Sequence, residues 1–152
     1  MNPQLSAFLE EFYAGAGGEV DGCHLMLRYF GDDLDPVRIT SLLKVQPTTS
    51  CRKGDCRLGK PAVFERTGVW LLDCGGGSET AENQIRALFA KLPANPDVWN
   101  ELSLLYSAGI KIHLSLARWC RVTILSSDVI ALIAERGLKL NLDIYAARPP
   151  TV

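Results

Sequence analysis

The sequence predicts an α+β fold, a ferredoxin-like sandwich with one mixed sheet of about five strands and helices mainly on one face. Residues 110–116 and 138–145 place apolar side chains at every second position, which is the period of a strand with one solvated face. Between them, residues 127–136 repeat apolar side chains at helical spacing. This order of strand, helix and strand predicts two parallel strands joined by a helical crossover.

The crossover helix has recognisable end signals. Ser127 and Asp128 are residue types that cap the first turn of a helix, and Gly137 is suited to end it in the left-handed conformation. We therefore expect a helix that begins near residue 127 and stops just before the second strand.

The first strand is expected at residues 23–30. Both of its faces are partly apolar, which favours a central position in the sheet. Asp35 followed by Pro36 then predicts the start of a helix that ends before Pro47.

Residues 46–60 are polar and basic and show no periodicity, so we expect a surface loop long enough to suggest a functional role. Residues 61–66 and 69–74 predict two short strands paired as a hairpin. Gly75, Gly76 and Gly77 follow, and a flexible joint is the favoured interpretation over a phosphate-binding loop, because the lysine and spacing of a nucleotide loop are missing.

Two more helices are expected before the residue 110 strand. Ser78 and Thr80 can cap a helix that carries apolar residues up to Leu92. Asn95 and Pro96 start a second helix, which we expect to end at Gly109.

The chain of 152 residues is expected to form one α+β domain at residues 23–152. Residues 1–22 precede it as a short amphipathic helix and a glycine-rich connection. The first residues lack the basic and apolar segments of a secretion signal, so we expect a cytoplasmic protein with reduced cysteines.

Composition argues against two classes of partner. Sixteen basic and seventeen acidic residues give a net charge of −1, which does not favour nucleic-acid binding. No apolar run approaches the roughly 20 residues that span a bilayer, so no membrane partner is expected. No cofactor is expected either, and no cysteines or histidines stand at the spacing of a metal site.

Several short motifs, taken in order, resemble a bacterial family known as domain of unknown function 4279. The similarity covers about residues 23 to 146 and rests on Tyr29-Phe30-Gly31, Leu34-Asp35-Pro36, Ile39-Thr40, Leu42-Leu43, Pro47-Thr48, Lys53-Gly54, Gly68-Val69-Trp70-Leu71-Leu72 and Asp143-Ile144-Tyr145. The family has no established activity. Some members are thought to be immunity proteins of toxin systems, so the resemblance implies a protein that neutralises a toxin.

The strand residues predict one candidate site. If His24 and His113 share a sheet face, they gather with Arg28, Ser115, Asn141 and Asp143. Asp143 and Tyr145 are the polar residues of that face to mutate first. Such a group suits anion binding or acid–base chemistry, because histidine titrates near neutrality. The alternative is the ordinary solvated face of a one-sided sheet.

The long loop predicts a second candidate site. Arg52, Lys53 and Arg57 give it a local positive charge suited to an acidic partner, although a solvated basic loop is the plainer interpretation. Trp119 is the tryptophan most suited to anchor an interface, whereas Trp70 and Trp99 sit in apolar patterns typical of a core.

Cys51 and Cys56 stand in the same loop, among basic residues that lower a thiol pKa. A redox pair and a loop disulfide are both open, and two incidental loop cysteines are the favoured interpretation.

No nucleophile and base pair can be placed, so the sequence favours a non-enzymatic protein-binding module. The family resemblance implies, as the particular case, an immunity-type protein that binds a toxin one-to-one. The alternative is a small-molecule sensor or enzyme that uses the polar sheet face. An exposed sheet face also makes a homodimer plausible.

Overall fold

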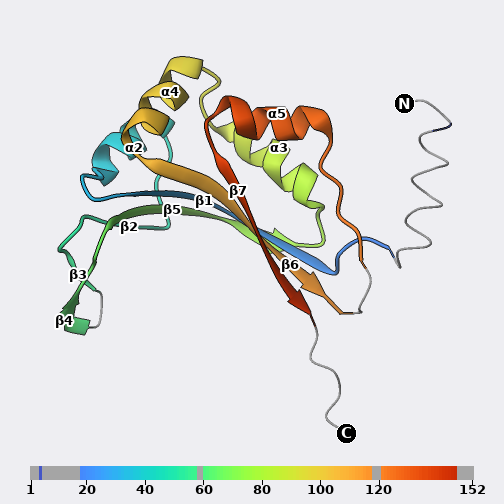
Figure 1. The fold of residues 1–152 in the computed structure, drawn as a ribbon, viewed down its shortest axis with the longest axis horizontal. Coiled ribbons are helices and arrows are strands. Elements are labelled where there is room, and N and C mark those ends of the chain that lie inside the picture. Colours follow the sequence, from blue (N-terminus) through green and yellow to red (C-terminus); the bar gives the residue numbers. More distant parts are fainter. Residues whose placement is uncertain (1–3, 5–17, 58–59, 118–120, 147–152) are drawn as a thin grey trace, which may run out of the picture.

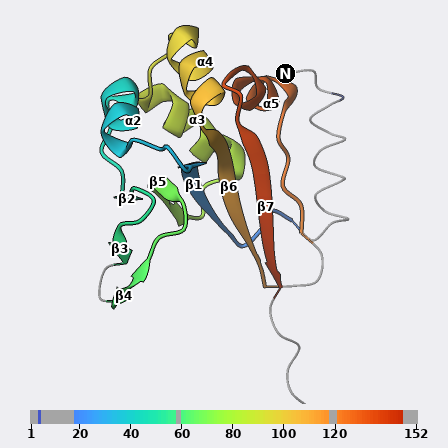
Figure 2. The same cartoon turned by 60° about the vertical axis from the view of Figure 1, so that its left-hand side comes forward.

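The computed structural model describes residue 4 and residues 18–57, 60–117 and 121–146. Within these residues, one mixed five-stranded sheet carries four helices on one face (Figure 1). Two short strands form a separate ribbon, which projects away from the helices (Figure 2). The predicted α+β class with helices on one face is confirmed, and the expected helix at residues 3–14 falls almost wholly outside the described residues.

The elements follow the chain as β1 (Gly22–Gly31), α2 (Pro36–Leu43), β2 (Thr49–Cys51), β3 (Cys56–Arg57), β4 (Lys60–Phe64), β5 (Gly68–Gly77), α3 (Ala81–Lys91), α4 (Pro96–Leu105), β6 (Ser107–Leu116), α5 (Ser127–Glu135) and β7 (Lys139–Ala146). The strands of the sheet lie in the order β2-β5-β1-β6-β7. Only β6 and β7 run parallel. The central position of β1 and the parallel β6–β7 pair were both predicted.

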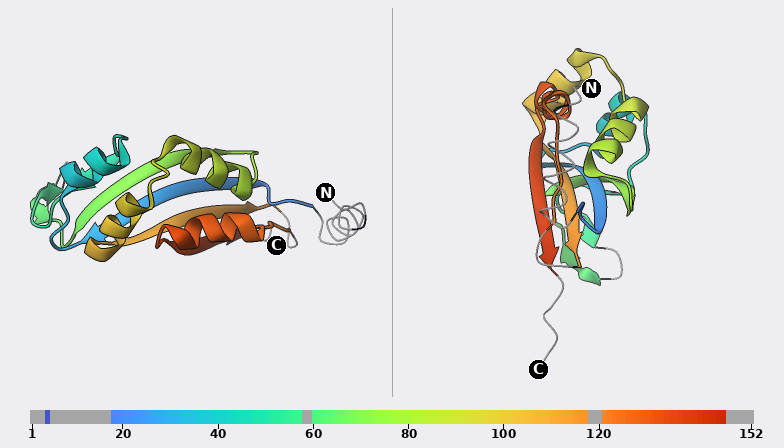
Figure 3. Two further views of the ribbon diagram at one scale, coloured as in Figure 1. Left: turned by 90° about the horizontal axis from the view of Figure 1, so that it is seen from above. Right: turned by 90° about the vertical axis from the view of Figure 1, so that its right-hand side faces the viewer.

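The core lies between the sheet and the helices, which cover the strands when the molecule is seen from above (Figure 3). Alternate residues of β1 point into it, and Leu25 and Leu27 have no exposed surface. Trp70 and Trp99 are buried as expected, and each indole finds an acceptor. Trp70 Nε1 donates to Thr40 Oγ1 at 3.0 Å, and Trp99 Nε1 donates to the Pro93 carbonyl at 2.8 Å.

Polar side chains cap three of the helices. Asp35, Thr80 and Asn95 accept hydrogen bonds from the first-turn amides of α2, α3 and α4. The expected cap of α5 is wrong by one residue, because the N-cap is Ser126 and its hydroxyl hydrogen-bonds to the carboxylates of Glu82 and Asp128 instead of the backbone.

The prediction for residues 46–74 is wrong in two respects. The expected loop contains β2 and β3, and the expected hairpin does not form. Instead β4 pairs with β3, whereas β5 pairs with β1 and β2. The pairings of β5 with β1 and β2 join segments distant in sequence, and local patterns cannot reveal them.

Two expected boundaries also differ. Strand β5 continues to Gly77, so the glycines are part of the sheet instead of a joint before α3. Helix α4 ends at Leu105, because Tyr106 adopts an extended conformation and its ring is buried. None of the helices that the structure describes is long and apolar enough to span a membrane.

Candidate functional site: the open face of the sheet

No described helix lies over the second face of the sheet, which we call the open face (Figures 1 and 3). Strand alternation sends the even-numbered residues of β1 and the odd-numbered residues of β6 and β7 to this face. In the register, His24 stands opposite His113, and His113 stands opposite Asp143. Three neighbouring strands thus place these three side chains in one row.

His24 is held by Asp73 of β5. Its Nε2 lies 2.6 Å from Asp73 Oδ1, and the same carboxylate oxygen accepts a hydrogen bond from the Gly75 amide at 2.8 Å. The Gly75 amide, followed by His24, lowers the pKa of Asp73. Asp73 is therefore an anion that fixes the orientation of the His24 ring.

His113 occupies the middle of the row. Its ring centroid lies 6.1 Å from that of His24, and the ring stacks on Tyr145 with centroids 5.4 Å apart. His113 Nε2 is buried and has no hydrogen-bond partner in the described residues, with Asp143 Oδ2 3.9 Å away. This nitrogen is therefore a buried polar atom in the middle of the row that makes no hydrogen bond within the described residues.

Lys111 completes the row at β6. Its Nζ lies 2.6 Å from Asp143 Oδ2 and lowers the pKa of that carboxyl. Asp143 therefore remains ionised at neutral pH.

Of the sheet residues that the sequence singled out, the structure brings His24, His113, Asp143 and Tyr145 together. Arg28 faces the same side but lies further along β1, opposite Gly109. Its neighbours form a separate feature.

A small hollow of about 200 Å³ surrounds Arg28, and we call it the cationic hollow. Gly109 leaves room at its floor, since a side chain there would meet the Lys139 carbonyl at 2.8 Å. Phe30 forms a wall, with the Arg28 guanidinium carbon 5.4 Å from its ring centroid. Its lining comprises Arg28, Phe30, Ser107, Ala108, Gly109, Lys139 and Asn141.

The cations of this hollow lack a carboxylate partner in the described part of the chain. Arg28 Nε is buried without a hydrogen-bond partner there, and Lys139 Nζ reaches only Ser107 Oγ, at 3.4 Å. An unpaired buried donor is unfavourable, so a carboxylate placed between the two cations would satisfy both.

Two cations of the predicted basic loop at residues 46–60 already have carboxylate partners. Arg52 Nη2 lies 2.6 Å from Asp35 Oδ1, and Lys53 pairs with Asp32 and lowers its pKa. The acidic turn before α2 therefore neutralises much of the local charge. The prediction that Arg52 and Lys53 bind a partner stays a prediction.

Three predicted positions fall on residues that the structure does not describe in full. Trp119 and the side chains of Arg57 and Cys56 lie outside the described part. Cys51 Sγ lies 4.0 Å from the Thr67 carbonyl oxygen. Among the described side chains, no group of three or more His, Cys, Asp or Glu residues is placed to hold a metal ion.

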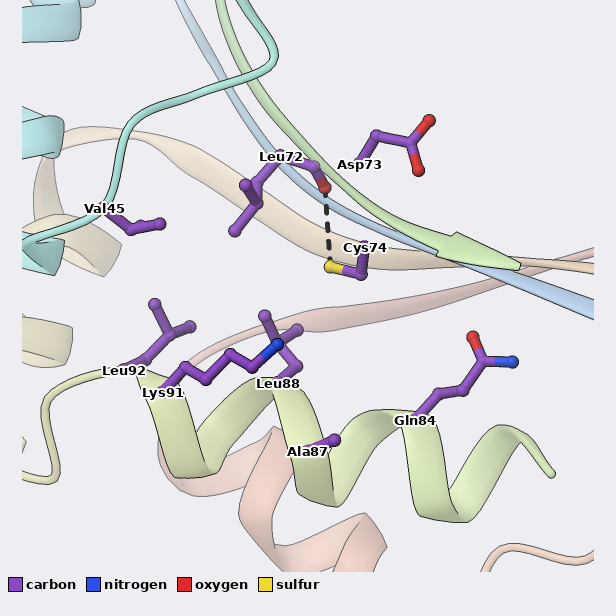
Figure 4. Close-up of a pocket in the computed structure, with 9 residues that line it drawn as sticks. All are labelled: Val45, Leu72, Asp73, Cys74, Gln84, Ala87, Leu88, Lys91 and Leu92. Atoms are coloured by element: carbon purple, nitrogen blue, oxygen red, sulfur yellow. Dashed lines mark hydrogen bonds between the residues drawn. The ribbon is translucent and has the colours of Figure 1, made fainter. Parts of the chain in front are cut away.

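A second hollow lies on the other side of the sheet, between β5 and α3 (Figure 4). This helix-side pocket has a volume of about 290 Å³. Its walls are mainly apolar, with a few polar groups at the rim. It is lined by Val45, Leu72, Asp73, Cys74, Gln84, Ala87, Leu88, Lys91 and Leu92.

The polar groups of the helix-side pocket differ in protonation and in hydrogen bonding. Desolvation raises the pKa of Cys74 to about 11, so its thiol stays protonated at neutral pH and is a poor nucleophile. Gln84 Oε1 is buried without a hydrogen-bond partner in the described residues. Lys91 makes no ion pair in the described residues. The Asp73 carboxylate points away from α3 and bonds to His24 (Figure 4), so the space between β5 and α3 combines apolar walls with one cation and one unused acceptor.

Sequence reasoning missed Asp73, Phe30 and Lys139 as site residues. Strand alternation assigned Lys139 and Phe30 to the polar faces of predicted strands. Nothing in the sequence indicates that both lie beside Gly109. Asp73 was hidden because the pairing of β5 with β1 contains a register shift between His24 and Met26.

The fold and the open face define an α+β sandwich protein in which no described helix covers one face of the sheet. The chain belongs to the family described as Domain of unknown function (DUF4279), whose model matches residues 21–147. No curated protein and no solved structure matches the chain significantly.

Proposed function

We propose that this protein is a non-enzymatic binding module that engages another protein through the open face. The observation that carries the proposal is the cationic hollow, in which Arg28 Nε is buried and unpaired beside Lys139. A partner's Asp or Glu side chain would enter this hollow and pair with both cations.

The make-up of the open face supports a protein partner. Met26, Arg28, Phe30 and Tyr145 are of residue types enriched at protein interfaces. The Asp73–His24 and Lys111–Asp143 contacts are already formed, so these side chains lose little freedom when a partner docks.

The test is capture of a partner from native lysate on the tagged wild-type chain, compared with an Arg28→Gln/Lys139→Gln variant. We expect one protein to be retained in near-equal amount by the wild type and to bind the variant about tenfold more weakly or worse, since the acidic side chain then enters an uncharged hollow.

The matched control is Arg38→Gln, because Arg38 pairs with Glu101 away from the open face, at 2.6 Å. This variant should retain the partner at the wild-type level. Equal retention by the double variant, or equal loss by the Arg38 control, would count against the proposed contact.

The particular case we propose is an immunity-type protein that neutralises a toxin by one-to-one binding. Two points support this case: the family resemblance, and the open face, whose Asp73–His24 and Lys111–Asp143 contacts are already formed. The captured protein should then carry a toxin domain whose activity falls to zero at a molar ratio of one. Continued toxin activity at a large excess of this protein would argue against neutralisation while leaving the binding function in place.

A second candidate function is binding of a small molecule, favoured by the helix-side pocket. Its apolar walls and Lys91 suit a compact apolar carboxylate. Octanoate should raise the melting temperature, and octanol should do so less, because it lacks the charge. Lys91→Gln should remove that difference. Arg38→Gln should keep it, because Arg38 does not line the pocket and pairs with Glu101. No shift with either probe at millimolar concentration argues against this function.

The histidine pair of the open face is a second candidate site for small-molecule binding. His24 and His113 face each other edge-on, and His113 Nε2 is unused in the described residues. A small anion bound there should stabilise the wild type more than a His113→Gln variant in a thermal shift with inorganic phosphate. Identical shifts for the two proteins would remove this place from consideration.

A further inference from the structure

Strand β7 forms one edge of the sheet. It pairs with β6 along its whole length, from Lys139 to Ala146, and no other described strand lies beside it. Alternate residues of a strand direct their amide and carbonyl groups to opposite sides. The outer side of β7 therefore presents backbone groups without a partner in the described residues, over a strand of eight residues that has no proline and no bulge.

The same strand carries exposed apolar side chains. Leu140, Leu142 and Ile144 are 38%, 48% and 63% exposed. Their neighbours on β6, in the same register and on the same face, are 4% exposed or less: Ile110, Ile112 and Leu114. Burial thus stops abruptly between two adjacent strands, and the described helices do not cover the edge.

These exposed side chains are concentrated at this edge. Eight large hydrophobic residues are exposed in the described part of the chain, and four of them lie on β7. An apolar edge strand of this length is a template for pairing with another strand.

We propose that a second copy of this chain covers the edge, with the two β7 strands paired antiparallel about a two-fold axis at Leu142. A two-fold axis perpendicular to the sheet keeps each face on its own side, so opposed residues must share a face. This register overlaps nearly all of both strands. Leu142 then stands opposite its own copy, and Leu140 opposite the partner's Ile144.

The polar residues of the strand fit this register. Asn141 stands opposite the partner's Asp143, and an amide can donate to that ionised carboxylate. Lys139 stands opposite the partner's Tyr145, so no like charges oppose each other. The cationic hollow keeps its Lys139, and the two open faces become one continuous surface.

The dimer is tested by light scattering after size-exclusion chromatography of the full chain, from low-micromolar to near-millimolar concentration. We expect the mass to approach twice the monomer value of 16.7 kDa as concentration rises. Leu142→Asp should raise the dissociation constant at least about tenfold, because it buries charges against each other at the axis. Leu104→Asp, at an exposed α4 position, should leave the dimer unchanged, and circular dichroism should show that both variants are folded.

The register has its own test. Leu142→Cys should form an intermolecular disulfide on mild oxidation, well above the wild-type level, because the two residues at the axis face each other. Asn141→Cys should not, since it stands opposite residue 143. A monomeric wild type at every concentration, or an undiminished dimer in Leu142→Asp, overturns the proposal, and a disulfide at position 141 but not at 142 overturns the register.

Discussion

Trp70 joins the sheet to a helix through one hydrogen bond. Its ring is buried in β5, and its indole nitrogen donates to Thr40 on α2 at 3.0 Å. The same ring meets Tyr29 edge-on, with centroids 5.9 Å apart. One side chain thus serves packing and polar satisfaction together.

Trp70→Phe should therefore lower the free energy of unfolding by about 1–3 kcal/mol, because the side chain becomes smaller and the Thr40 hydroxyl loses its hydrogen-bond donor. Urea denaturation measures the change. Thr40→Val in the Trp70→Phe background should cost less than in the wild type, because the hydroxyl no longer has a partner to lose. Equal costs in both backgrounds would show that the hydrogen bond contributes little.

Gly109 is the residue whose lack of a side chain shapes the cationic hollow. A Cβ there would approach the Lys139 carbonyl oxygen to 2.8 Å, which β7 can relieve only by moving. Gly109→Ala should cost about 1–3 kcal/mol of stability and weaken capture of an acidic partner. Gly22→Ala is the matched control, because its Cβ would meet only Ser115 at 3.5 Å, an ordinary contact. Equal denaturation midpoints for the two variants would contradict this account.

At the residue scale, alternation predicts which side chains of one strand share a face, but not which faces of different strands coincide. Whether His24 shares a face with His113 was open from the sequence, and the register of the three strands decides it. The 6.1 Å approach of the histidine rings depends on the β1–β6 register, which is set by the whole sheet.

Among the elements, α3 shows how local sequence and tertiary contact combine. Thr80 accepts the Asn83 amide at its start, and Arg86 on its surface reaches Asp128 of α5 at 2.6 Å. The cap is a local feature and was predicted, whereas the ion pair depends on the packing of two helices.

Thr80→Ala should destabilise the protein by about 1 kcal/mol, because one first-turn amide loses its acceptor. Thr80→Ser should restore most of that loss, since its hydroxyl can accept the same bond. Chemical denaturation of the three proteins is the measurement. A serine variant as unstable as the alanine variant would indicate that the methyl group, and not the cap, is what matters.

The helices and the long strands were predictable because their patterns are local, and the short strands were not. Strand β2 has three residues, and Thr49 to Cys51 have no strand pattern of their own. They are extended because they pair with Val69–Leu71 of β5. The expected hairpin failed for the same reason, since β5 finds better partners in β1 and β2 than in its neighbour along the chain.

For the whole molecule, acid sensitivity follows from carboxylates held as anions. Hydrogen bonds and ion pairs lower the pKa of Asp21, Asp32, Asp73, Asp128 and Asp143, that of Asp128 to about 2. A depressed folded-state pKa contributes stability that is present above the ordinary value of 3.8 and is lost as the pH falls through the folded value.

These groups should therefore leave stability unchanged between pH 7 and about pH 5 and reduce it progressively from about pH 4 down to pH 2. Urea denaturation at each pH measures the effect. Asp128→Asn should flatten the lower part of that decline. A stability that rose on acidification below pH 4 would contradict the sign of all five shifts.

The central position of β1 has a consequence for synthesis on the ribosome. Gly22–Gly31 is made before both of its neighbours in the sheet, β5 and β6, and the second of these ends at Leu116. A nascent chain that has not yet released residues 107–116 can satisfy only one side of its central strand. The sheet therefore cannot close until β6 has emerged, and until then the apolar β1 exposes an edge that can pair with other chains.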